Sequence, residues 1–303
     1  MQMIGPKPPF PTSTIHTIRL CLFQSTRRPK MVEKIIETSF GKVRIKGRLG
    51  QAHLDVFEAI CYSRERKKDS EGRIHILVDP WAVRKTSGQM SGAQFCSGTT
   101  FRRILDDLMQ AIIEIIEPSH LACIGHLVDH IDTAVKSSTG EKILRNGPFG
   151  ERELWTVKLG EAFCRLVQKD VWIGYDPAPI ARIGHGISQH VARHILTHRN
   201  EPNGGWKLNT LIEATAGKTT SAVLRKYRER IKEDAPRMAE IGIVIEGDHL
   251  KVLRENECDT KTRQRDTKTR FSSSNISGAP SGALLKYMGT PLEGCPSISE
   301  KKR

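Results

Sequence analysis

The stretch Thr219–Leu253, TTSAVLRKYRERIKEDAPRMAEIGIVIEGDHLKVL, joins a basic amphipathic segment to two short β-rich runs. At 100° per residue, its apolar side chains fall on one stripe of a helix predicted over Thr219–Met238. The two runs within Ile241–Leu253 flank a turn that contains Gly247 and Asp248, which is typical of a β-hairpin. The stretch therefore predicts a long helix followed by a hairpin. The residues of the apolar stripe are Leu224, Tyr227, Ile231, Ala235 and Met238.

The residues before this stretch extend the pattern toward the N-terminus. Ile187–His198 has the spacing of an amphipathic helix, a Gly/Asn/Pro turn follows over Asn200–Gly205, and a short helix is predicted over Leu208–Ala214. Gly217 separates that short helix from the long one. A helix, a helix-turn-helix and a hairpin, in this order, are the elements of a winged helix-turn-helix domain, which we place at residues 177–255.

A longer block with the same order of elements comes first, at residues 38–176. Two such blocks predict an α+β fold with two tandem winged helix-turn-helix domains. Two further stretches, His120–Val135 and Glu153–Tyr175, have the composition of long β-rich arms of a wing, with helix or strand left open. The other predicted elements of the block are helices over Leu49–Glu65, Pro80–Lys85 and Thr99–Glu117 and a strand over Arg73–Val78.

Both ends of the chain are predicted to be flexible tails. The leader, residues 1–37, is Pro-rich and lacks the basic start and long apolar core of a signal peptide. In the tail, residues 256–303, the segment Asp259–Arg263 is repeated as Asp266–Arg270 among polar residues. Such a composition cannot offset the entropy lost on ordering. The basic repeats would either attract phosphates without specificity or serve only to keep the protein soluble.

The charge balance indicates the partner. The 303 residues include 48 Lys and Arg against 34 Asp and Glu, which gives a formal net charge of +14. An excess of this size favours a polyanion, and no stretch approaches the roughly 20 apolar residues that cross a bilayer. We therefore expect double-stranded DNA as partner and no membrane. The seven cysteines form no CxxC pair, which is typical of reduced thiols in a cytoplasm.

The helix face opposite the apolar stripe is the predicted DNA-reading surface. Short residues at its start would allow close approach to base edges, and their hydroxyl and N–H groups would bind phosphate. Arginine and lysine would bind guanine or phosphate, and glutamate would accept from cytosine. A solvated basic face on a surface helix is the alternative. The predicted contacts are Thr219, Thr220, Ser221, Ala222, Arg225, Lys226, Arg228, Glu229, Arg230 and Lys232 on the helix, and His249 and Lys251 on the hairpin.

The corresponding helix of the first block, Thr99–Glu117, has a weaker basic face. DNA contacts there would be limited to its first turn, at Thr99, Arg102 and Arg103. A protein–protein face is an equal alternative, because Met109 and Ile113 leave apolar surface that needs covering. The predicted core stripe of this helix is Phe101, Ile104, Leu105, Leu108, Ile112 and Ile116.

Patterns for other chemistries are incomplete. Ala216–Thr220 has the ending of a phosphate-binding loop, but Ile212 stands where that loop needs glycine. His190, His194 and His198 have the i, i+4 spacing of metal ligands, without an accompanying glutamate or cysteine. No His-x-His pair occurs in the chain, and no pair of carboxylates is placed for acid–base work. We expect no catalytic residue, no metal and no cofactor.

The segment Gly47–Ile60, GRLGQAHLDVFEAI, resembles the opening of the first winged helix in TrfA-type plasmid replication initiators. Ser188–Gly217, which contains Gly205–Leu211, is similar to the start of the second winged helix in the same proteins, and the resemblance covers Thr38–Arg254. It implies an initiator that binds repeated origin sites (iterons), helps to open AT-rich DNA and recruits host replication proteins, without enzymatic activity. It also implies that the second domain reads the major groove and that the first supplies backbone contacts or dimerisation.

Two functions follow as alternatives. The first is initiation of plasmid replication and control of copy number in the bacterial cytoplasm. Its partners would be plasmid origin repeats, the host replication initiator, helicase and polymerase clamp proteins, and a second copy of the chain. The second is a winged-helix transcriptional repressor, which overlaps with the first because initiators often repress their own promoters. Two tandem domains with a long first wing favour the initiator.

Overall fold

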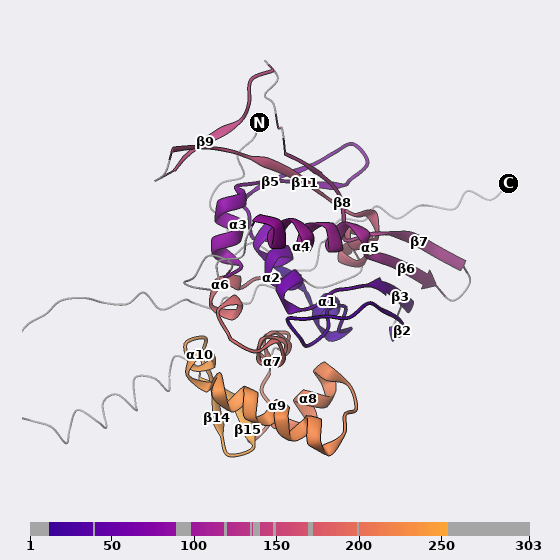
Figure 1. The fold of residues 1–303 in the computed structure, drawn as a ribbon. Helices are drawn as coiled ribbons and strands as arrows, with labels where there is room; N and C mark the ends of the chain where they lie inside the picture. Colours follow the sequence, from indigo (N-terminus) through magenta and orange to yellow (C-terminus); the bar gives the residue numbers. More distant parts are fainter. Residues whose placement is uncertain are drawn as a thin grey trace, which may run out of the picture.

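The computed structural model describes residues 12–38, 40–88, 98–117, 120–133, 135, 140–147, 150–168, 172–198 and 200–253. Within these ranges the chain mixes helices with antiparallel sheets, so the predicted α+β class is confirmed. Buried side chains form two cores. Each core lies in one of the two units that Figure 1 shows. No helix in these ranges is long and apolar enough to span a membrane.

The C-terminal unit is built on a helix-turn-helix and a hairpin. Its sheet has the strand order β13-β15-β14. Gly217 ends α8 with a φ of +77°, a left-handed conformation that glycine adopts without steric cost, and the chain then turns into α9. The elements are α6 (Pro177–Ala181), α7 (Gly186–Leu196), β13 (Trp206–Lys207), α8 (Leu208–Ala216), α9 (Ser221–Glu233), α10 (Ala235–Ala239), β14 (Ile243–Glu246) and β15 (His249–Val252).

The predicted single helix over Thr219–Met238 is wrong at its C-terminal end. The chain leaves α9 after Glu233 and starts α10 at Ala235. Pro236 stands in the first turn of α10, where a missing N–H is tolerated, whereas a longer α9 would place it in a helix interior. Asp234 at the break has a separate role. Its two carboxylate oxygens accept from the backbone N–H groups of Gly184 (3.0 Å) and His185 (2.9 Å).

The first unit contains two four-stranded sheets, β4-β5-β11-β8 and β2-β3-β6-β7, and a separate β9–β10 hairpin. Its helices are α2 (Gln51–Cys61), α3 (Pro80–Thr86), α4 (Gly98–Gln110) and α5 (Glu161–Gln168). Its strands are β2 (Val32–Thr38), β3 (Gly41–Gly47), β4 (Glu65–Lys68), β5 (Ile74–Val78), β6 (Ile112–Glu117), β7 (His120–His126), β8 (Val128–Asp132), β9 (Leu144–Gly147), β10 (Gly150–Glu153) and β11 (Trp155–Leu159).

The predicted helix over Thr99–Glu117 is wrong in its second half. Helix α4 ends at Gln110, and β6 pairs with β3 and β7. Burial alternates along β6, so that Ile113 and Ile115 are buried while Ile112 and Ile116 are half-buried. β-Branched residues favour strands, which explains the change of element. The apolar surface expected at Ile113 therefore lies inside the core, which removes the main support for a protein–protein face on this helix.

Two other boundaries differ from the prediction. The helix predicted over Leu49–Glu65 is α2, which ends at Cys61 before β4 begins at Glu65. The stretch predicted as a wing arm over Glu153–Tyr175 is a strand only in part, because α5 follows β11 directly. Phe163, Leu166 and Val167 are all buried, and their i, i+3, i+4 spacing fits a helix better than a strand.

The prediction of a flexible leader is wrong for residues 12–37. β1 (Ser13–Thr14) pairs with β12 (Trp172–Ile173), and α1 (Ile15–Arg19) follows at once. Ile18 is buried in the core of the C-terminal unit, whereas Leu22 and Phe23 are buried in the core of the first. A short apolar stretch of the predicted leader, Ile18–Phe23, thus connects the two cores. Residues 1–11 and the predicted basic tail, residues 256–303, lie outside the described ranges.

The two units repeat one topology. In the first, α2, β5, α3 and α4 precede β8 and β11, and the sheet order is β5-β11-β8. In the second, α7, β13, α8 and α9 precede β14 and β15, and the sheet order is β13-β15-β14. Each element of one series therefore has an equivalent in the other. Helices α2 and α7 are equivalent, and so are α4 and α9. Figure 1 shows α7 at the junction between the units.

Candidate nucleic-acid interface

The first turn of α9 is arranged as a capped helix start. The Thr220 hydroxyl accepts from the backbone N–H of Val223 at 3.4 Å, so Thr220 is the N-cap and Ser221 is the first helical residue. Ser221 and Ala222 are exposed. The Thr219 hydroxyl oxygen is shielded from solvent and has no hydrogen-bond partner among the described residues. Among the predicted contacts at this helix start, Thr219 is therefore the one whose hydroxyl is not accessible to a phosphate.

The sides of α9 divide as predicted. Ile231 is buried, and Leu224 and Tyr227 are half-buried against the second core. We call the α9 face those predicted contact residues of the helix that are exposed. Its one internal ion pair joins Arg225 and Glu229 at 3.9 Å, an i, i+4 pair with side chains 82% and 63% exposed. Such a loose surface pair leaves the Arg225 guanidinium available to a ligand. The α9 face consists of Ser221, Ala222, Arg225, Lys226, Glu229 and Lys232.

The remaining predicted residues on this unit are engaged within the protein. Arg228 forms an ion pair with Asp248 in the hairpin turn, and Lys251 Nζ lies 2.6 Å from Glu246 Oε2. His249 lies opposite Glu246 in the backbone register of the hairpin. Both His249 and Arg230 are half-buried. The Arg228–Asp248 pair fastens the hairpin to α9, and the two ion pairs neutralise the charges of Arg228 and Lys251. A phosphate would therefore meet the α9 face first.

Helix α4 offers a smaller basic surface. Thr99, Arg102 and Arg103 are exposed at its start. Arg102 Nε lies 3.7 Å from Asp106 Oδ1 on the next turn, in an exposed i, i+4 pair. The following carboxylate, Asp107, is engaged by Arg48 and by His53 Nε2 at 3.0 Å. With two arginines and an acidic second turn, α4 can contact a phosphate backbone but has little to read bases with.

The histidine stripe of α7 packs inside the protein. His190 Nε2 lies 3.2 Å from the Ile18 carbonyl, and its Nδ1 lies 2.7 Å from Ser25 Oγ. Burial lowers the pKa of His190 to about 3 and that of His194 to about 4, so both are neutral at pH 7. Within the described ranges, no three His, Cys, Asp or Glu side chains converge as a metal site would require.

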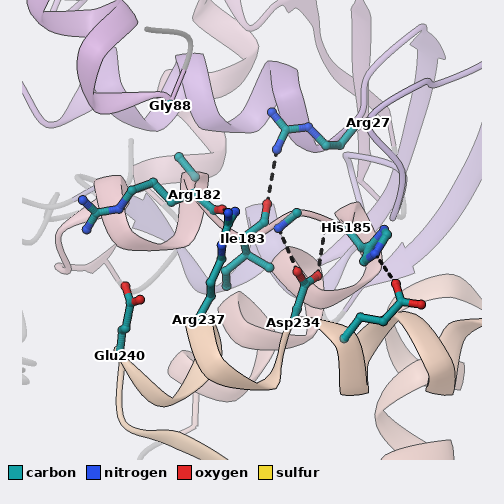
Figure 2. Close-up of a pocket in the computed structure, with 11 residues that line it drawn as sticks. Arg27, Gly88, Arg182, Ile183, His185, Asp234, Arg237 and Glu240 are labelled. Atoms are coloured by element: carbon teal, nitrogen blue, oxygen red, sulfur yellow. Dashed lines mark hydrogen bonds and ion pairs between the residues drawn. The ribbon is translucent and has the colours of Figure 1, made fainter. Parts of the chain in front are cut away.

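A cavity of about 740 Å³ lies beside α10 at the junction of the units (Figure 2). Its wall contains carboxylates and cations in equal number, and some of them already pair. His185 Nε2 lies 2.7 Å from Glu233 Oε2, and Arg27 Nη1 donates to the Ile183 carbonyl at 3.3 Å. With this balance the wall selects neither an anion nor a cation. The charged residues that line it are Arg27, Arg182, Arg237, Glu233, Asp234 and Glu240.

One cluster was missed by the sequence analysis. Arg193 on α7 is fully buried and bonds to Gln51, Asp55 and Glu58 on α2. The signal was present in the segment GRLGQAHLDVFEAI, where Gln51, His53, Asp55 and Glu58 interrupt a helix that is otherwise apolar. Every residue of α2 from Leu54 to Cys61 is buried, so those polar residues have no solvent-facing side to occupy.

Comparisons with known proteins give little further guidance. No protein-family model and no curated protein matches the chain. The crystal structure of selenomethionine derivatives of domains 2 and 3 of RctB aligns with 79% of this chain and 96% of its own, at 10% identity and a TM-score of 0.47. A second structure of RctB domains 2-3 aligns with 73% and 82% of the two chains, at 11% identity and a TM-score of 0.45. Scores and identities this low assign neither the fold nor the function.

Proposed function

We propose that this protein is a sequence-specific double-stranded DNA-binding initiator of plasmid replication. The observation that carries the proposal is the α9 face, an exposed basic surface on the second helix of a helix-turn-helix. Arg225 and Lys226 project from it, while Ile231 anchors the opposite side in the core. A helix with this division can enter the major groove while its scaffold stays outside.

The repeated topology supports two winged helix-turn-helix domains. In each unit three helices and three neighbouring antiparallel strands follow in the same order, with α4 and α9 in the position of the recognition helix. The α9 face would read most of the bases. Arg102 and Arg103 on α4 would contact the backbone and read a second, shorter block, because arginine can donate to guanine. Two readers on one chain suit directly repeated sites such as iterons, and the formal charge of +14 suits phosphate.

The remaining parts of the proposal rest on the resemblance at Gly47–Ile60. They are origin opening, recruitment of the host initiator, helicase and clamp, and a homodimer for copy control. We propose no enzymatic activity for this chain. The weak basic face of α4 favours one alternative, a repressor that reads a single site through α9.

The experiment is a pull-down of duplex fragments from the protein's own replicon, sequenced at two salt concentrations. Enrichment of one region with direct repeats supports the initiator. Enrichment of a lone promoter palindrome supports the repressor. Even binding to all fragments that disappears at the higher salt contradicts sequence-specific recognition by either.

A further inference from the structure

The first helices of the two units meet through a buried polar network. Arg193 donates from Nε to Glu58 (3.0 Å), from Nη1 to Gln51 (2.8 Å) and from Nη2 to Asp55 (2.6 Å). The Arg193, Asp55 and Glu58 side chains are all 0% exposed. Tyr175 donates its hydroxyl to the other oxygen of Glu58. One guanidinium on α7 thus uses all three of its nitrogens on three side chains of α2.

Two further side chains contact Asp55 at the periphery of the network. Gln189 Nε2, one turn before Arg193, donates to Asp55 Oδ2 at 3.2 Å, and Arg27 Nη2 lies 4.0 Å from the same oxygen. Burial lowers the pKa of Arg193, but Glu58 and Asp55 raise it by more, so the net direction is upward and the guanidinium stays charged. A sliding of α7 along α2 by one turn, about 5.4 Å, would leave these charges buried and unpaired.

The segment 24–29 is wedged between the same two helices. The Gln51 N–H donates to the Thr26 carbonyl at 2.9 Å. A Cβ on Gly50, the N-cap of α2, would lie 2.5 Å from the Thr26 carbonyl oxygen. A Cβ on Gly186, the first residue of α7, would lie 2.8 Å from Thr26 Cα. The starts of the two equivalent helices are therefore both glycine, and each approaches Thr26 from its own side.

We infer that Arg193 is a positioning residue for DNA recognition, which holds α4 and α9 at one mutual distance and so restricts the protein to paired DNA sites of one spacing. This inference rests on the proposed function, since spacing matters only where both helices contact one duplex. Apolar packing alone tolerates small shifts, because it has no direction. A guanidinium bonded to three partners on another helix fixes both translation and rotation.

The test selects spacing directly. Wild-type protein is offered a duplex library in which two random blocks are separated by spacers that vary over one helical turn, about 10 base pairs. It should enrich two sequence blocks at one spacing, and affinity should fall about tenfold or more when the spacer changes by half a turn.

The decisive variant replaces the charged network by apolar side chains of similar volume, as Asp55→Leu with Glu58→Leu and Arg193→Met. Such replacements commonly preserve folding. The variant should enrich the same blocks but lose less than about threefold when the spacer changes by half a turn. If the triple variant does not fold, two single variants give the same test. Arg193→Lys keeps the charge but loses the guanidinium's several N–H donors, and Gln189→Ala removes a contact to Asp55. Ile76→Val, a core change in β5 away from the junction, is the matched control and should keep the wild-type spacing.

The outcomes separate the two proposals. A folded network variant with wild-type spacing preference overturns the positioning role of Arg193. A wild-type protein that enriches one block only, at no spacing, overturns the two-reader model and the positioning role with it, but leaves DNA recognition by α9 standing. Enrichment of no block by wild-type protein overturns the proposed function itself.

Discussion

Two of the places at which arginine and carboxylate side chains meet in this protein have opposite consequences. On the α9 face, Arg225 and Glu229 are 3.9 Å apart and largely exposed, whereas at the junction Arg193 and its two carboxylates are fully buried at 2.6–3.0 Å. Exposed i, i+4 pairs contribute about 0.3–0.5 kcal/mol, while breaking a buried pair costs about 3–5 kcal/mol. In the proposed function, the same residue types therefore serve binding where water competes and positioning where it does not.

The largest expected effect follows from removing the buried cation. Arg193→Met leaves Asp55 and Glu58 without their main partner, so we expect the free energy of unfolding to fall by about 3–5 kcal/mol. Urea denaturation at pH 7 measures it. Arg225→Met on the α9 face is the matched control and should change stability by less than about 0.5 kcal/mol. Equal losses in the two variants would contradict the distinction between the two sites.

The next effect tests burial of the histidine beside the junction. The pKa of His190 is about 3 in the folded protein against an ordinary value of 6.5, so the unfolded chain binds the proton more readily. The stability contribution is complete above pH 6.5 and is lost as pH falls toward 3, by about 1.4 kcal/mol per pH unit. His190→Gln should therefore lose about 2 kcal/mol less than wild type between pH 6.5 and pH 5. If the urea midpoints of wild type and His190→Gln fall by the same amount between these pH values, His190 is not the group responsible for the loss of stability.

The exposed site should respond in binding rather than in stability. Arg225→Ala with Lys226→Ala removes two cations from the α9 face, and we expect specific duplex affinity to fall about 10- to 100-fold, with a salt slope smaller by about 2. Fluorescence anisotropy at several salt concentrations measures both. Lys42→Ala with Lys46→Ala, on β3 of the first unit, removes the same charge from the other unit. If this control loses as much affinity as the Arg225→Ala, Lys226→Ala variant, α9 contributes to binding only through the net charge.

The smallest effect concerns the carboxylate of the α9 face. Glu229→Gln releases Arg225 from its 3.9 Å pair and changes stability by less than about 0.5 kcal/mol. If Glu229 accepts from cytosine, base preference at one position should relax in a sequence selection, while total affinity rises or stays the same. An unchanged preference would assign Glu229 to the solvated surface.

How far the sequence could predict this molecule depended on where polar residues face. The elements α8, α9, β14 and β15 have polar residues on the side away from the core, so their periodicity predicted them and the α9 face. In Ile112–Glu117 the isoleucines fit a helical stripe through Ile112 and Ile116 and a strand through Ile113 and Ile115, and only pairing with β3 and β7 decides between them. Arg193 was unpredictable because its partners are more than 130 residues away in sequence.

The segment that passes between the two units also constrains how the chain folds. Ile18 completes the C-terminal core, and Leu22 and Phe23 complete the first, so a few consecutive residues are shared between the two. During synthesis Ile18 emerges early but has no core to enter until the hairpin at the far end of the C-terminal unit has been made. Neither unit can therefore unfold without disturbing the core of the other through this segment. Thermal unfolding of the intact chain should accordingly follow a single cooperative transition.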